Sequence, residues 1–200
     1  ARGVELLTGW GLRPVLAPNA YARQGYLAGA DALRAADLNT AFADPQVRGV
    51  ICTRGGYGAQ RVVDAIDMAA VRRDPKMVAG FSDITALQLA LWRGARLAGV
   101  HGPGAAWRDE RTPLASAESL HAAMTSTEPV TVRAVEGEET FGVRVAGRAT
   151  GRLLGGNLCL VVASLGTPDM PNLTGVAIRT LQGPRGFGPK AAPANIRHES

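Results

Sequence analysis

A serine at residue 82 is the side chain best placed to do chemistry. It lies in residues 78–91 (VAGFSDITALQLAL), where an apolar strand pattern gives way to a tight turn and then to an apolar helix pattern. A serine at such a turn is lifted above the sheet, and the backbone N–H groups at the helix start can stabilise a developing oxyanion. Ser82 is therefore a candidate nucleophile. The alternative is a helix-capping serine, because the second glycine of the G-x-S-x-G motif is missing here.

A glycine-rich loop, residues 54–58 (RGGYG), follows another apolar strand pattern and enters a helix. Its glycines permit positive φ angles and let the backbone approach a ligand closely. The loop could supply an oxyanion N–H group to Ser82, cradle a phosphate, or form no more than a tight turn. Because neither the Walker pattern nor the G-x-G-x-x-G spacing is present, a phosphate- or nucleotide-binding module is the remote alternative to an enzyme.

A histidine, His101, ends a third apolar strand pattern in the sequence His-Gly-Pro. It could act as general base for Ser82, or it could be a structural histidine bonded to nearby backbone. The sequence contains no H-E-x-x-H or C-x-x-C motif and no paired His/carboxylate cluster, so neither a metal nor a cofactor is expected. Cys52 and Cys159 lie in apolar segments, which predicts buried thiols in a reducing, cytoplasmic compartment.

These residues need a scaffold, and the first 125 residues predict one of the α/β class. Helix and strand patterns alternate, which indicates a parallel sheet with flanking helices, Rossmann- or flavodoxin-like. In such sheets ligands gather at the carboxyl ends of the strands, where residues 53–58, 82–83 and 101–104 are expected. Strands are predicted over residues 13–18, 47–52, 76–81 and 95–100, and helices over residues 3–11, 28–42, 59–66 and 83–93.

A different organisation is predicted beyond this α/β domain, to which we assign residues 1–115. The segments VTVRAVEG and ETFGVRVAG alternate with period two, which predicts an antiparallel pair of strands. The segment GRLLGGNLCLVVASLG predicts a Gly-Gly turn that enters an apolar run. We therefore assign residues 126–175 to the start of an incomplete β-rich C-terminal domain.

The net charge of +5 raises the question of a nucleic-acid partner. Residues 176–200 hold four basic side chains against one acidic side chain, together with three Gly and three Pro. This composition predicts an irregular basic tail outside the fold, and no nucleic-acid partner is expected. No membrane association is expected either, because the longest apolar run, residues 158–165, is too short to span a bilayer. Residues 1–10 lack a signal-peptide pattern.

Four segments occur in a characteristic order: TRGGYGAQRVVDAID, PKMVAGFSDITALQLAL, VHGPGA and GRLLGGNLCLVVASLGTP. Together they resemble the LD-carboxypeptidases, serine peptidases of a family that also includes microcin C immunity proteins. The resemblance implies hydrolysis of an amide bond between an L- and a D-amino acid centre. The usual substrate is the murein tetrapeptide, which loses its terminal D-alanine in peptidoglycan recycling. A microcin-type acyl-adenylate substrate and a non-catalytic remnant that binds muropeptide are the alternatives, and a homodimer is implied.

The resemblance also implies roles for individual residues. Ser82 would be the nucleophile. The backbone N–H groups of Asp83 and Gly56 would form the oxyanion hole. Arg54 and Tyr57 would line the cleft for the peptide substrate.

The family's nucleophile works in a Ser–His–Glu triad whose Glu and His follow the segment matched by residues 151–168. By the resemblance, the turn at His101 shapes the floor of the site and is not the catalytic histidine. The tail contains His198 and Glu199, to which neither role is assigned, because catalytic groups need a scaffold that fixes their geometry. We therefore expect a family member truncated at both ends, with a tail read in another frame and negligible activity on its own.

Overall fold

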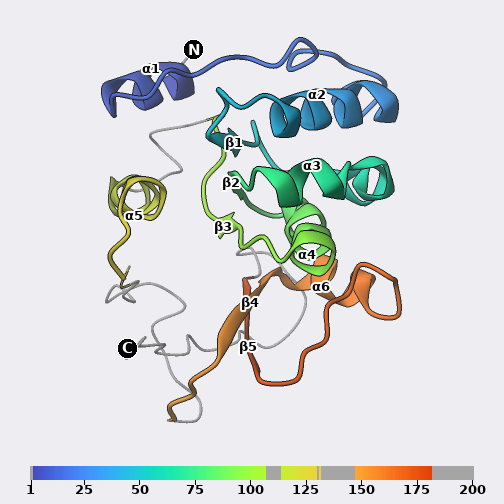
Figure 1. Cartoon of the computed structure of the whole chain (residues 1–200), viewed down its shortest axis with the longest axis vertical. Coiled ribbons are helices and arrows are strands. Elements are labelled where there is room, and N and C mark those ends of the chain that lie inside the picture. The colour runs from blue at the N-terminus through green and yellow to red at the C-terminus, as the bar shows by residue number, and fades with distance from the viewer. Residues whose placement is uncertain (1, 107–113, 130, 132–146, 182–200) are drawn as a thin grey trace.

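A sheet of three parallel strands forms the centre of the protein (Figure 1). The computed structural model describes residues 2–106, 114–129, 131 and 147–181. The strands are apolar and lie in the order β1 (Gly49–Ile51), β2 (Met77–Gly80) and β3 (Val100–His101). Val78 and Ala79 of the central strand are fully buried, as expected for a parallel sheet covered on both faces. The predicted α/β class with a parallel sheet is confirmed.

The register of the sheet brings the three strand ends to one edge. Val50 pairs with Val78, and Ala79 pairs with Val100. All three strands run in the same direction, so the loops after them leave from the same side. The strands are shorter than the apolar runs that predicted them.

Helices cover both faces of this sheet (Figure 1). On one side lie α2 (Asp31–Ala43), α3 (Met68–Arg73) and α4 (Ile84–Ala95). On the other side lies α5 (Leu114–Thr125), with α1 (Arg2–Gly9) above it in the view. Among the described residues, no helix has the length and apolar character needed to cross a bilayer.

The core lies between the sheet and its helices. Its buried side chains come from α2, α3, α4 and β2, with Ile66 before α3, and the cluster consists of Phe42, Ile66, Ala70, Val71, Val78, Leu87 and Leu91. Helix α4 is buried continuously from Thr85 to Leu91. A helix that is buried all round is largely apolar, and the two buried polar side chains of α4, Thr85 and Gln88, both form hydrogen bonds.

Three local predictions for the α/β domain are wrong. Of the strand predicted over residues 95–100 only Val100 lies in β3, because α4 extends to Ala95. Residues 13–18 form no strand, and Val15 is 77% exposed. Pro14 and Pro18 lack the N–H donors that a ladder needs. The helix predicted over residues 59–66 consists of two 3₁₀ turns, Ala59–Arg61 and Val63–Ala65, since adjacent β-branched valines disfavour a continuous helix.

Helix α3 was not predicted from the sequence. Its start is capped by Asp67, whose carboxylate accepts hydrogen bonds from the backbone N–H groups of Ala69 and Ala70 at 2.9 and 3.0 Å. An aspartate cap of this kind stabilises even a short helix.

The C-terminal part contains a parallel strand pair, β4 (Arg152–Asn157) and β5 (Val176–Leu181), joined through α6 (Leu158–Ser164). The predicted Gly-Gly turn is wrong, because Gly155 and Gly156 lie within β4. A side chain at either glycine would collide with β5 or α4, so these positions need glycine for close approach.

The irregular tail predicted from residue 176 is wrong over its first six residues. Val176, Ile178 and Thr180 are β-branched and continue the ladder of β5 beside β4. The remaining residues, 182–200, lie outside the described part of the chain, as does nearly all of the predicted antiparallel pair over residues 130–147.

Candidate active site

Three loops meet at the carboxyl edge of the sheet, as the sequence predicted. The loop after β3 bonds back to the end of the neighbouring strand β2 and to the residue that follows β1. The N–H of Gly102 donates to the carbonyl of Gly80 at 3.2 Å, and the N–H of Ala105 donates to the carbonyl of Cys52 at 3.0 Å. Gly104 lies so close to β1 that a side chain there would collide with the carbonyls of Cys52 and Thr53. These contacts bring residues 53–58, 82–83 and 101–106 together.

Ser82 has an unusual backbone conformation. Its φ is +58°, and among the described non-glycine residues it shares a positive φ only with Arg96, which ends α4. The left-handed region costs a residue with a side chain about 1–2 kcal/mol, and such strain is typical of a nucleophile held on a sharp strand-to-helix turn. The residue at the N-cap position of α4 is Asp83, not Ser82. This argues against the alternative of a helix-capping serine.

Gly55 is the loop residue that contacts the serine. A Cβ at Gly55 would lie 2.8 Å from the Cβ of Ser82 and 3.0 Å from the carbonyl oxygen of Phe81. Gly56, the residue predicted for the oxyanion hole, has φ +128° and open space where a Cβ would be. The sequence indicated the loop but not which of its glycines lies against the serine.

Asp83 contributes a side-chain contact that the sequence did not reveal. Its carboxylate accepts a hydrogen bond from the backbone N–H of Ala59 at 2.8 Å, and the residue is only 7% exposed. Ala59 is the first residue after the glycine-rich loop. The bond therefore ties the serine turn to the loop that faces it. An acidic residue directly after the serine was the available signal.

Arg54 and Tyr57 are exposed at the mouth of this site. Tyr57 is 78% exposed and meets the ring of Tyr26 edge to face, with centroids 6.3 Å apart. Arg54 borders a pocket of about 430 Å³ whose other lining residues lie between Ala20 and Ala28. This segment was not predicted to belong to the site, although its two tyrosines, Tyr21 and Tyr26, were an available signal in the sequence.

His101 is held by α4. Its Nδ1 lies 3.2 Å from Oε1 of Gln88, and Nε2 of Gln88 donates to the carbonyls of Gly80 and Val100 at 3.2 and 2.9 Å. Because the amide nitrogen donates, its oxygen accepts, which places the imidazole proton on Nδ1. Burial lowers the pKa of His101 below its usual 6.5, so the ring is neutral at pH 7. These contacts favour the structural interpretation over a general base.

The two cysteines differ in their exposure to solvent. Burial raises the pKa of the Cys52 thiol to about 12, so this thiol is not a nucleophile at neutral pH. Cys159 is exposed on α6, which corrects the prediction that both thiols are buried. Within the described ranges, no group of three or more His, Cys, Asp or Glu side chains is arranged to hold a metal ion.

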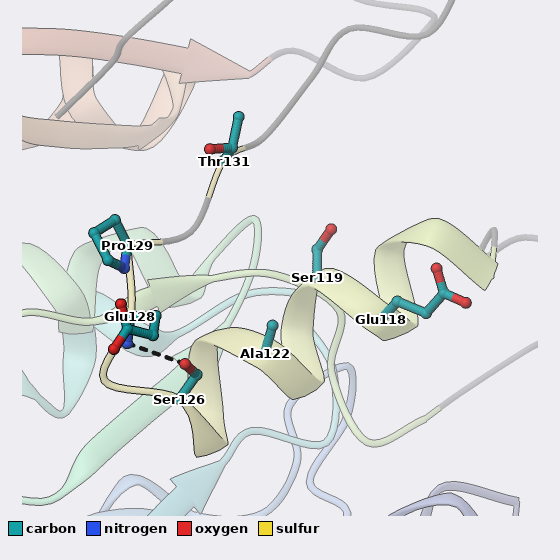
Figure 2. Close-up of a pocket in the computed structure, with 7 residues that line it drawn as sticks. All are labelled: Glu118, Ser119, Ala122, Ser126, Glu128, Pro129 and Thr131. Carbon is teal, nitrogen blue, oxygen red and sulfur yellow. Dashed lines mark hydrogen bonds between the residues drawn. The ribbon is translucent and has the colours of Figure 1, made fainter.

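Another pocket, of about 300 Å³, lies at the end of α5. Figure 2 shows its lining side chains, including Ser126, whose hydroxyl accepts the N–H of Glu128 at 3.0 Å. None of the residues predicted for the serine site lines this pocket, so the two sites are separate.

Comparison with known proteins identifies relatives among the carboxypeptidases. Residues 1–102 match the N-terminal domain of the LD-carboxypeptidases, peptidase family S66. A putative carboxypeptidase of Streptomyces coelicolor is 46% identical over 170 residues, covering 83% of this chain and 54% of its own length. A probable murein peptide carboxypeptidase of Bacillus subtilis is 38% identical over 149 residues, covering 73% of this chain and 46% of its own length.

Solved structures agree with these sequence relatives. An MccF-like protein of Bacillus anthracis superimposes with a TM-score of 0.80 at 26% identity, covering 88% of this chain and 59% of that one. The chain thus spans about half the length of the curated relatives it matches.

Proposed function

The chain belongs to the LD-carboxypeptidase family, peptidase family S66, and we propose that it provides the nucleophile half of a serine peptidase that removes terminal D-alanine from the murein tetrapeptide. One observation carries the proposal. Ser82 stands in a left-handed turn between β2 and α4, with Gly55 packed directly against it. This is the geometry in which a serine hydroxyl faces a substrate while backbone N–H groups lie beside it.

In the proposed reaction, Oγ of Ser82 attacks the carbonyl carbon of the L,D-amide bond. The carbonyl oxygen becomes an oxyanion, which accepts hydrogen bonds from the backbone N–H of Asp83 and from the facing loop at Gly56. The hydroxyl proton passes to a general base and then to the leaving amine, so that D-alanine departs and an acyl-serine remains. Water then hydrolyses the acyl-serine.

His101 is a poor candidate for the general base. Its Nδ1 proton faces Gln88, and no described histidine accepts a hydrogen bond from the Ser82 hydroxyl. We assign the role of general base to no residue of this chain, since the family resemblance places the His and Glu of the triad after the segment matched by residues 151–168. His101 instead holds the floor of the site by fixing the end of β3 on α4.

The cellular setting is part of the proposal. Peptidoglycan recycling is the process that consumes murein tetrapeptides, and the cytoplasm is the compartment we propose for it. The unpaired thiol of Cys52 fits a reducing compartment. A homodimer remains part of the same proposal.

Calorimetric titration of the chain with murein tetrapeptide tests the proposal. We expect saturable binding that Gly55→Val abolishes, since the new side chain would meet Ser82. The matched control is Gly147→Val, a position where no described atom lies within 4 Å of an added Cβ. Absence of binding, or equal binding by both variants, would contradict the proposal. Tighter binding of aspartyl sulfamoyl adenosine would favour the acyl-adenylate alternative instead.

Release of D-alanine by the same chain is expected to stay at background, because an unactivated serine loses several orders of magnitude in rate. Ser82→Ala is the control. Release that this substitution abolishes would show that the chain supplies its own base.

A further inference from the structure

The pocket beside Arg54 is built from two segments that are far apart in the sequence. One wall is the turn of residues 20–28, and the other is the start of the glycine-rich loop. The turn is tight, because the backbone groups of Gln24 and Leu27 exchange hydrogen bonds at 3.0 and 3.1 Å.

Two contacts join residues 20–28 to the glycine-rich loop, and a third holds that loop to α2. Tyr26 meets Tyr57 edge to face. The Leu27 side chain packs on Gly58, where an added Cβ would lie 2.9 Å from it. The guanidinium of Arg34 donates to the carbonyl of Gly58 at 3.1 Å. The pocket is therefore a preformed feature of the fold, which lowers the entropy lost on binding.

The charge of the pocket is positive. Among its described lining residues, the charged ones are Arg23 and Arg54, and no acidic side chain lines it. Neither arginine forms an ion pair with a described residue. By contrast, the nearby Arg34 and Arg61 are both paired with Asp31. The two pocket guanidiniums are thus available for an anionic ligand, and a guanidinium fork fits a carboxylate.

The position of Arg54 indicates which carboxylate of the substrate the pocket would bind. Arg54 directly precedes Gly55, which packs on Ser82. In a peptide cut at its last amide bond, the terminal carboxylate carbon is only three bonds from the carbonyl carbon that the serine attacks. It is therefore the carboxylate held nearest to the nucleophile.

We infer that the pocket between residues 20–28 and Arg54 binds the terminal carboxylate of the peptide substrate, with Arg54 as its ligand and Arg23 as a second cation. Tyr26 and Tyr57 form the adjoining wall. This inference rests on the proposed function and names the group that makes the enzyme a carboxypeptidase rather than an endopeptidase.

The test compares murein tetrapeptide with its C-terminal amide, which lacks only the terminal charge, by calorimetric titration of the chain. We expect the acid to bind about tenfold to hundredfold more tightly, the range of a charge-assisted hydrogen bond. In Arg54→Gln we expect the ratio of the affinity for the acid to the affinity for the amide to fall towards one. In Arg23→Gln we expect the same ratio to fall by less. The control is Arg13→Gln, at an exposed arginine outside the pocket. We expect this variant to retain the affinity ratio of the unsubstituted chain.

Two kinds of result would contradict the carboxylate site. Equal binding of acid and amide by the unsubstituted chain, or an unchanged preference in Arg54→Gln, overturns the carboxylate site while leaving the proposed function in place. Failure of both ligands to bind overturns the proposed function and the carboxylate site with it. Both arginines are exposed, and far-ultraviolet circular dichroism checks that the variants are folded.

Discussion

The carboxylate of Asp83 accepts a hydrogen bond from the backbone N–H of Ala59 at 2.8 Å. The bond joins the residue after the proposed nucleophile to the residue after the glycine-rich loop, 24 positions earlier. It is shielded from water, because Asp83 is almost fully buried. The spacing between Ser82 and the loop backbone therefore depends on this bond. We regard Asp83 as a positioning residue as well as an oxyanion donor.

Removing the Asp83 carboxylate is expected to destabilise the protein. In Asp83→Ala the buried N–H of Ala59 loses its acceptor, which costs about 1–3 kcal/mol of unfolding free energy. Asp83→Asn keeps an acceptor oxygen and should lose less. Urea denaturation measures both. Asp64→Ala, at an exposed aspartate, is the control and should stay within about 0.5 kcal/mol of the unsubstituted chain. Equal effects of Asp83→Ala and Asp64→Ala would refute the role of the bond.

Gly55→Ala is expected to disturb the serine turn directly. The added methyl would press on the Cβ of Ser82 and on the carbonyl of Phe81. Overpacking of this kind costs about 1–3 kcal/mol. Thermal or urea unfolding measures the loss, and Gly147→Ala, whose added methyl meets no described atom within 4 Å, should show almost none. A stable Gly55→Ala protein that binds peptide normally would mean that the loop does not lie against Ser82.

Thr85 connects the serine helix to the C-terminal strands. Its buried hydroxyl oxygen accepts the backbone N–H of Asn157 at 2.9 Å. Thr85→Val keeps the shape but leaves that N–H without a partner, so we expect a loss of about 1–3 kcal/mol and faster hydrogen exchange at Asn157. Thr85→Ser retains the hydroxyl, so the backbone amide of Asn157 should remain protected from hydrogen exchange. Unchanged exchange in Thr85→Val would rule out the connection.

Acid is expected to weaken the fold partly through His101. Burial lowers its pKa in the folded protein, so as the pH falls below about 6.5 the unfolded chain takes up the proton first. Its contribution to stability is therefore complete above pH 6.5 and declines as the pH falls towards the lowered pKa. His101→Gln should lose less stability than the unsubstituted chain between pH 7.5 and 5.5 in urea denaturation. Identical losses would contradict this assignment.

The sequence was sufficient for features that depend on local pattern. Short apolar strands between helices predicted the parallel sheet, and an apolar run broken at Ser82 predicted the strand–turn–helix unit. Both follow from the periodicity of neighbouring residues. Because parallel strands share one carboxyl edge, the meeting of the three loops was also predictable.

Features that depend on tertiary partners were not predictable. Nothing local to Asp83 identifies Ala59 as its partner, and nothing local to Gly55 sets it apart from Gly56. Strand β5 was missed because the Gly- and Pro-rich composition of residues 182–200 obscured a six-residue segment in which every residue but Arg179 is β-branched or apolar. The error at residues 13–18 is the opposite one, because a strand was predicted and none is present. An apolar run forms no strand where no neighbouring strand pairs with it.

The central claim is that substrate binds at Ser82, and nuclear magnetic resonance of the labelled chain tests it most directly. Titration with murein tetrapeptide should shift the backbone amides of Gly55, Gly56, Ser82 and Asp83 in a saturable way. The amides of Ser119 and Ala122, which line the separate pocket at α5, should stay in place. Shifts at the α5 pocket with none at the serine turn, or no shifts at all, would contradict the account.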